Sequence, residues 1–174
     1  MGNLTQHFDE SEFRCPCCGK LVHDVTLSKR LEQLHKALNA KAIIITSGYR
    51  CPSHSVAVGG YANDAHVQGF AADVVAYKKS GSPYTAETVA REAEKLGFGG
   101  IGIISNDAVH LDIRDVHPEY PNMHWFGDER THNDNIATFQ KMGEPIEEDE
   151  PETKKHVIEL FIDGVSVYRK ESDV

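Results

Sequence analysis

The sequence predicts an α+β fold, because helical and strand patterns are mixed along the chain without strict alternation. A helical pattern with three- and four-residue spacing runs through residues 26–39 and consists of Leu27, Leu31, Leu34 and Leu38. Strand patterns, rich in β-branched residues or alternating in polarity, occur in four short runs, which are residues 41–46, 70–76, 100–104 and 109–114.

The segments around these runs complete the expected order of elements. Residues 41–46 are apolar throughout their middle, so we expect a buried strand that stops at Ser47. Residues 53–69 contain three glycines and no periodicity, and are predicted to be loop. A second helix is expected over residues 85–96, a turn over 105–107 and a last short helix over 134–142.

Composition limits the classes of protein that this chain can belong to. Its 174 residues suit one main domain, and 40% of them are hydrophobic, which is typical of a globular protein. The net charge of −9 argues against nucleic acid or an anionic membrane as the main partner. No apolar run is long enough to span a bilayer, and the acidic first twenty residues contain no visible secretory signal.

Charge and turn residues divide the chain into three parts. Residues 1–142 form the main domain, and residues 143–155 are rich in acids and read as a solvated linker. Residues 156–174 contain two alternating runs around Asp163-Gly164, which predicts a β-hairpin. Because a lone hairpin is marginally stable in water, we expect it to dock on the main sheet, a second copy of the chain or a partner protein.

The first chemical signal is the pair His66 and Asp73. They lie seven residues apart with small residues between them, and such neighbours allow the close approach that a metal ligand needs. A carboxylate among the apolar residues of the 70–76 strand would also need a charged partner. The alternative is that Asp73 caps a turn and His66 belongs to a surface loop.

The second signal is the run from Asp107 to Arg114. On a strand, the two-residue period places His110, Asp112 and Arg114 on one face and apolar residues on the other. This pattern favours a lined cleft, although a half-exposed surface strand would show the same alternation. Asp107, in the preceding turn, is near enough to share one site with His110.

Taken together, these residues match a known kind of metal centre. Two histidines and one carboxylate that leave a fourth position open are the ligand set of a catalytic zinc site. In this sequence the ligands would be His66, Asp73 and His110, and Asp107 would supply the general base.

Four motifs follow one another along the chain, and they are Ser47-Gly48-Tyr49-Arg50, Val58-Gly59-Gly60, His66-x-x-Gly69-x-Ala71-x-Asp73 and Val109-His110-Leu111-Asp112. Over roughly residues 4–127 the chain resembles the zinc D-Ala-D-Ala carboxypeptidase family of peptidoglycan peptidases. That family includes D,D-dipeptidases and phage L-alanyl-D-glutamate endolysins, and the hedgehog signalling domain shares its fold. The resemblance implies a small, mainly antiparallel sheet flanked by helices.

The resemblance also implies a role for each matching residue. It places the zinc ligands at His66, Asp73 and His110. It makes Asp107 the catalytic acid or base, three positions before the last ligand. Arg50 would contact the substrate carboxylate or the developing oxyanion. The implied reaction is peptide hydrolysis by a zinc-activated water, with Asp107 as general base.

Three further residues are assigned to the surroundings of the site. Asp112 matches a common His-x-Asp form and is expected to support Arg114 or a ligand histidine. Trp125 lies where relatives often carry a tryptophan, and would form either a cleft wall or an ordinary core aromatic. Asp64 replaces the serine usual in relatives, and would alter substrate choice or hold the loop through a hydrogen bond.

The four cysteines leave several arrangements open. Cys15, Cys17 and Cys18 lie close together in the sequence, and Cys51 follows Arg50. They could be free thiols or a thiol-rich zinc site, and the resemblance suggests a Cys15–Cys51 disulfide, which needs an oxidising compartment. Adjacent Cys17 and Cys18 rarely bind one ion together, and the spacing differs from the usual paired C-x₂-C pattern, so no second metal is predicted.

The predicted function is therefore zinc-dependent hydrolysis of peptidoglycan stem peptides, of the D-Ala-D-Ala carboxypeptidase or L-Ala-D-Glu endopeptidase type. The alternative is a non-catalytic, zinc-stabilised module of the same fold that binds the cell wall or a protein. Asp107 and Arg50 favour the enzyme, because a binding scaffold needs neither. Release of a phage lysin by host lysis, transport on a phage particle or an unseen export route would each bring such an enzyme to the wall.

Overall fold

The computed structural model describes residues 2–120, 122, 124–141, 156–162 and 165–172. In chain order its elements are α1 (Glu10–Phe13), α2 (Val25–Ala37), β1 (Ala42–Ser47), α3 (Pro52–Ala57), α4 (Ala65–Gln68), β2 (Ala71–Tyr77), α5 (Ala86–Lys95), β3 (Gly100–Ile103), β4 (Ala108–Asp112), the 3₁₀ helix η1 (Arg114–Val116), β5 (Trp125–Asp128), β6 (His156–Ile162) and β7 (Val165–Ser172). The predicted acidic linker, residues 143–155, and the Asp163-Gly164 turn lie outside the described residues.

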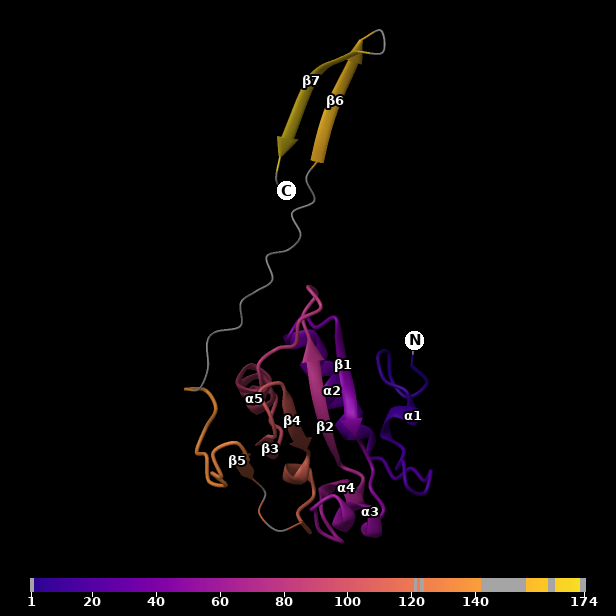
Figure 1. Ribbon diagram of the computed structural model, residues 1–174, viewed down its shortest axis with the longest axis vertical. Helices are drawn as coiled ribbons and strands as arrows, with labels where there is room; N and C mark the ends of the chain where they lie inside the picture. Colours follow the sequence, from indigo (N-terminus) through magenta and orange to yellow (C-terminus); the bar gives the residue numbers. More distant parts are fainter. Residues whose placement is uncertain (1, 121, 123, 142–155, 163–164, 173–174) are drawn as a thin grey trace.

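Five strands form one sheet in the order β1-β2-β4-β3-β5 (Figure 1). Neighbouring strands are antiparallel except for β3 and β5, which are parallel. This arrangement confirms the predicted α+β fold with a mainly antiparallel sheet. Because β2 and β4 are neighbours inside the sheet, Asp73 lies directly opposite His110 although the two residues are far apart in the sequence.

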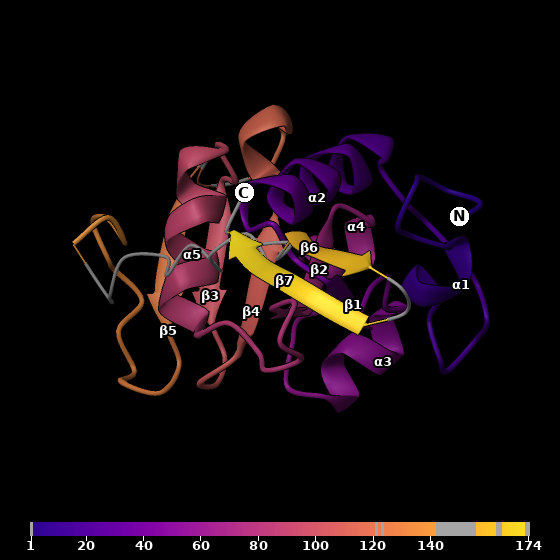
Figure 2. The same cartoon turned by 90° about the horizontal axis from the view of Figure 1, so that it is seen from above.

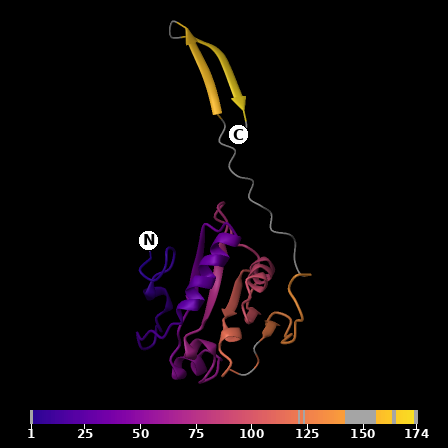
Figure 3. The same ribbon diagram turned by 180° about the vertical axis from the view of Figure 1, so that it is seen from behind.

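Helices α2 and α5 lie on the same face of the sheet, as the views from above and from behind show (Figures 2 and 3). Both helices are amphipathic: α2 buries Leu27, Leu31 and Leu34, and α5 buries Val89 and Ala93. Their apolar stripes pack on the apolar face of the strands, and removal of this surface from water holds the two layers together. The opposite face of the sheet carries Asp73 and His110 together with the exposed Ile44.

Strand β1 differs from the buried strand that the sequence predicts. It forms an edge of the sheet, where Ile43 and Ile45 are buried but Ile44 is 46% exposed. An apolar run indicates a strand but does not distinguish an inner strand from an edge strand. The edge position therefore follows from the order of strands in the sheet.

The predicted loop over residues 53–69 is wrong in two places, because it contains most of α3 and all of α4. Both helices are too short to show a helical period, and each is specified by its first residues instead. Pro52 stands in the first turn of α3, and Asp64 caps α4 by accepting a hydrogen bond from the Val67 N–H.

The helix predicted over residues 134–142 is also wrong, since the described residues up to 141 contain no helix there. Their backbone N–H groups bond elsewhere: Ile136 donates to the Phe126 carbonyl at 2.9 Å, and Phe139 donates to the Glu94 carboxylate at 2.8 Å. Phe139 is fully buried and anchors the segment to the core. Helix α1 and strand β5 were not predicted from the sequence.

Strands β6 and β7 pair with each other as a separate two-stranded antiparallel sheet, which confirms the strands of the predicted hairpin. What this hairpin docks on stays a prediction. Within the part of the chain that the structure describes, no helix combines the length and the apolar character needed to cross a membrane.

Candidate metal centre and active site

The polar face of β4 carries one half of the site. Val109, Leu111 and Ile113 are fully buried in the core, so the strand period turns His110 to the opposite face. On β2, opposite His110, Asp73 is only 7% exposed. A buried carboxylate is costly without a partner, and His110 supplies one, since its Nδ1 lies 3.0 Å from Asp73 Oδ1.

His66 reaches the same point from α4. This helix ends at Gly69, whose φ of 81° is readily adopted by glycine, and the chain then turns into β2. His66 is 3% exposed, and its Nδ1 lies 2.7 Å from the Gly48 carbonyl oxygen. Because a carbonyl can only accept, Nδ1 carries the proton, and the lone pair of Nε2 is directed toward Asp73 and His110.

Three side-chain atoms converge at this point. His66 Nε2 lies 3.2 Å from Asp73 Oδ1 and 3.1 Å from His110 Nδ1, so the three atoms form a nearly equilateral triangle. Ligands of a tetrahedral zinc ion, each about 2.0–2.2 Å from the metal, lie roughly 3.3 Å apart. The donor set therefore fits a single metal ion and leaves one coordination position for water or substrate.

The same contacts shift the pKa values of the group. Burial alone would raise the pKa of Asp73, but hydrogen bonds from His110 and His66 outweigh it and hold the pKa far below its usual range. Burial alone would lower the pKa of His110, yet its hydrogen bonds to Asp112 and Asp73 raise that pKa to about 9. Without a metal, this shift favours the His110 ring with protons on both nitrogens at neutral pH.

Asp112 lies behind His110 and has no exposed surface. Its Oδ1 accepts hydrogen bonds of 2.9 Å from both the backbone N–H and Nε of Arg114, and its Oδ2 lies 3.2 Å from His110 Nε2. Asp112 thus contacts both Arg114 and a candidate ligand, and it orients the His110 ring. The carboxylate fits only because residue 100 is glycine, since a Cβ there would overlap it.

Arg50 stands beside the three candidate ligands, in the segment that follows β1. Its guanidinium pairs with Asp73 through Nη2, and its Nε donates to the Ser47 hydroxyl at 2.8 Å. Its backbone N–H donates to the His66 carbonyl at 3.3 Å, which fixes the segment against α4. The guanidinium is therefore held in place by Asp73 at Nη2 and by Ser47 at Nε.

A cavity of about 630 Å³ opens over these residues. The predicted site residues that line it are Arg50, Asp64, His66, Asp73, His110 and Trp125. The Trp125 ring, on β5, stands edge to face with His110 at a centroid distance of 6.1 Å, and the Arg114 guanidinium lies 5.4 Å from its centroid. Trp125 is therefore placed as a wall of the cavity.

Asp64 borders the cavity and holds the loop that precedes α4. Its Oδ1 accepts from the Val67 N–H at 3.0 Å and its Oδ2 from the Tyr61 N–H at 3.1 Å, and the Ser55 hydroxyl also donates to it. Burial alone would raise the pKa of Asp64, but these hydrogen bonds outweigh burial and lower it. Of the two roles expected for Asp64, these contacts match the one that holds the loop.

Asp107 lies in the turn between β3 and β4, where it is half-buried and accepts a hydrogen bond from the Ser105 hydroxyl at 2.8 Å. It is not among the described residues that line the cavity, although His110, three residues later, is. Glu129 and Asp134 line the cavity as further carboxylates, and sequence reasoning missed both. Neither belongs to a motif or to a regular period.

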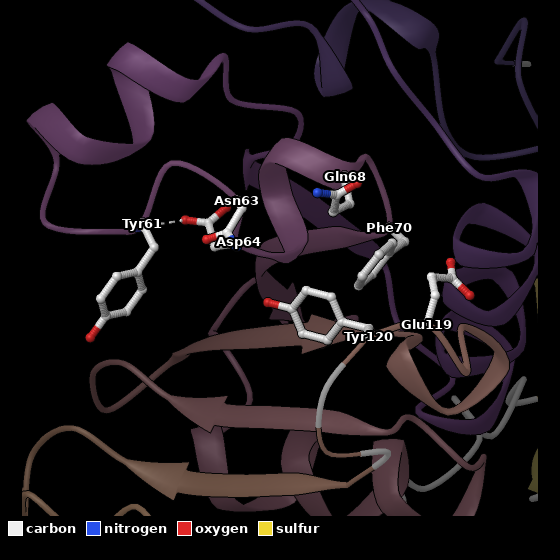
Figure 4. A pocket seen from close by; sticks show the side chains of 7 residues that line it. All are labelled: Tyr61, Asn63, Asp64, Gln68, Phe70, Glu119 and Tyr120. Carbon is white, nitrogen blue, oxygen red and sulfur yellow. Dashed lines mark hydrogen bonds between the residues drawn. The ribbon is translucent and has the colours of Figure 1, made fainter.

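A smaller pocket of about 300 Å³ adjoins the cavity and shares Tyr61, Asp64 and Tyr120 with it (Figure 4). Tyr120 packs edge to face against Phe70 at a centroid distance of 5.1 Å. The sequence analysis did not single out either tyrosine. They come from irregular segments after α3 and after η1, and only the fold brings them together.

A comparison with protein families agrees with this site. The family model described as peptidase M15 matches residues 6–112, which is more than half of the chain and contains all three candidate ligands, Arg50 and Asp107. The chain therefore belongs to the peptidase M15 family of zinc D-Ala-D-Ala carboxypeptidase-like peptidases. This membership supports a metallopeptidase in general. No match was found among curated proteins.

Proposed function

We propose that this protein is a zinc peptidase that hydrolyses peptide bonds in peptidoglycan stem peptides, either as a D-Ala-D-Ala carboxypeptidase or as an L-Ala-D-Glu endopeptidase. The observation that carries the proposal is the convergence of His66 Nε2, Asp73 Oδ1 and His110 Nδ1 beside an open cavity. Two histidines and one carboxylate match a catalytic rather than a structural zinc site.

The metal would be held by these three atoms, with Gly48 and Asp112 orienting the two histidine rings. A bound zinc ion would polarise the scissile carbonyl and lower the pKa of its water to about 7. The protein's own contribution is to hold the three ligands in place with little exposure to solvent, so that their side chains need little reorganisation when substrate binds.

Arg50 is proposed to bind the anion of the substrate. Its guanidinium has five N–H donors, and contacts to Asp73 and Ser47 use only part of them. The remaining donors would hold either a substrate carboxylate or the oxyanion that develops during hydrolysis. Stem peptides carry α-carboxylates at D-Glu and at the terminal D-Ala, so both candidate bonds offer such a group.

Asp107 is proposed as the general base, which takes a proton from the attacking water and passes it to the leaving amine. Support for this role comes from its position three residues before His110 and from Ser105, which fixes one of its carboxylate oxygens. Glu129 and Asp134, which line the cavity, are the competing carboxylates.

The test is hydrolysis of defined muropeptides, with metal content measured on the same samples. We expect one zinc at the histidine site, cleavage by the wild type, and loss of turnover with retained zinc in Asp107→Asn. Glu129→Gln and Asp134→Asn are matched controls that should keep turnover. If one of them abolishes it and Asp107→Asn does not, the base is that residue.

Product masses identify the bond that is cleaved. Zinc at the histidine site without cleavage of any muropeptide would instead support the alternative of a non-catalytic binding module. Absence of zinc from this site would overturn the proposal altogether.

A further inference from the structure

The N-terminal segment and the segment after β1 bring three cysteines together. Cys15 and Cys18 come from the turn after α1, and Cys51 precedes α3, yet the three sulfur atoms all lie within 4.8 Å of one another. Cys15 is buried, Cys51 is half-buried and Cys18 is exposed, and all three are free thiols. We propose that Cys15, Cys18 and Cys51 form a second metal site, which binds zinc through thiolates and has a structural role.

The backbone of the turn directs two of these sulfurs to one point. The Cys15 carbonyl accepts from the Gly19 N–H at 2.8 Å, and the Cys15 N–H donates to the Lys20 carbonyl at 2.9 Å. Gly19 closes the turn with a φ of 69°, a conformation that favours glycine. Cys15 and Cys18 are thus one C-x₂-C pair on a tight turn, which is the spacing of two ligands in thiolate zinc sites, and the single Cys51 stands where the usual pattern has a second pair.

The third sulfur is set up to be a thiolate. The Cys51 N–H donates to the Cys15 sulfur at 3.4 Å, so the two cysteines are connected directly. The Ser53 hydroxyl and the His54 N–H donate to the Cys51 sulfur and lower the pKa of its thiol to about 6. The thiolate is the form that binds metals, and these donors are placed to stabilise it on Cys51.

Cys17 lies outside this set of three. It is exposed, and its sulfur is not part of the group of three that lie within 4.8 Å of one another. Because Cys17 also adjoins Cys18 in the sequence, both cannot easily reach one ion. Water is expected in the fourth coordination position.

The proposed site would support the peptidase centre through the chain segment that carries Gly48 and Arg50. The Tyr49 N–H donates to the Phe13 carbonyl at 2.8 Å, so the N-terminal segment already packs on the chain that carries Gly48 and Arg50. Gly48 orients His66, and Arg50 pairs with Asp73. A metal that joins Cys51 to the Cys15–Cys18 turn would clamp this chain in place.

The experiment measures metal per chain in the reduced, full-length protein and repeats the measurement after loading with cobalt. We expect two metals per wild-type chain and, with cobalt, the near-ultraviolet absorption of sulfur-to-cobalt charge transfer. Cys18→Ser, an exposed position, should leave one metal and remove this absorption. The matched control Cys17→Ser should keep two metals and the absorption. His110→Ala should lose one metal and keep the absorption.

The cysteine site is independent of the proposed function, because the metals at the two sites are counted separately. Charge-transfer absorption that persists in Cys18→Ser, or that disappears in Cys17→Ser, would overturn the ligand set. A Cys15–Cys51 disulfide, detected by mass spectrometry of the unreduced protein, would overturn the site. A cooperative melting transition in each variant shows that loss of metal is not loss of folding.

Discussion

Asp73 and His110 occupy opposite positions on two adjacent antiparallel strands, and their side chains meet with 3.0 Å between Asp73 Oδ1 and His110 Nδ1. This pairing is what gives the candidate metal centre its fixed geometry. The sheet hydrogen bonds set the distance between the two backbones, and His66 then completes the group from a helix outside the sheet.

Removal of the Asp112 carboxylate charge should weaken metal binding without removing a ligand. In Asp112→Asn the His110 ring loses the anion that orients it, so we expect metal affinity to fall about 10–100-fold. Competition with a chelator measures this change. Asp115→Asn is a control outside the site, because Asp115 pairs with Arg30. Equal losses in both variants would contradict the role of Asp112.

Metal binding should become tighter as pH rises. The pKa of His110 is raised to about 9 in the metal-free protein, so below this pH the metal must displace a proton. One proton per metal gives a change in affinity of about tenfold per pH unit, which should level off above about pH 9. Calorimetric titrations between pH 6.5 and 9.5 test the slope, and the exposed His124, replaced in His124→Gln, should not change it.

The same pKa shift should make the metal-free protein less stable as pH rises, whereas metal binding becomes tighter. Because His110 binds its proton more tightly in the folded protein, this contribution to stability is complete below about pH 6.5 and is lost as pH rises through about 9. The metal-free protein should therefore lose this contribution over that interval, as thermal melting of the wild type and of His110→Gln would show. If the melting temperatures of the wild type and of His110→Gln differed by the same amount at every pH, the raised pKa of His110 would be contradicted.

Gly100→Ala should destabilise the fold by about 1–3 kcal/mol, because the new methyl group overlaps the buried Asp112 carboxylate, which cannot move without breaking its bonds to Arg114. Gly102→Ala provides the comparison. There the new methyl group meets the end of the Trp125 ring, which borders the cavity and can shift. Melting curves should show the larger loss for Gly100→Ala.

Arg50→Ala should lower kcat/KM for a cleaved muropeptide by about 10²–10³-fold, the effect of removing one donor to an oxyanion. Arg50→Lys keeps the charge beside Asp73 but loses the planar fork, so it should retain metal and recover only part of the activity. Full activity in Arg50→Ala would remove Arg50 from the mechanism, and full activity in Arg50→Lys would show that the charge suffices without the planar fork. Metal analysis of both variants separates this effect from loss of the ion.

Much of the fold could be predicted because it depends on local patterns. The leucines of α2 and the alternation along β4 follow from the helical and strand periods, which need only neighbouring residues. The two short helices α3 and α4 could not be predicted in this way, since Pro52 in the first turn starts α3 and the Asp64 cap starts α4. Residues 134–141 do not form a helix, because the Ile136 N–H donates to the Phe126 carbonyl and the Phe139 N–H donates to the Glu94 carboxylate.

The site divides along the same line. The sequence by itself identified His66, Asp73 and His110 as candidate ligands, and the strand period alone placed His110 and Asp112 on one face. Only the tertiary structure decided that the three ligand atoms meet, that Trp125 and Tyr120 border the cavity while Asp107 does not, and that Cys51 reaches Cys15. Periodicity is a property of the local backbone, whereas these distances depend on strand order and packing between segments far apart in the chain.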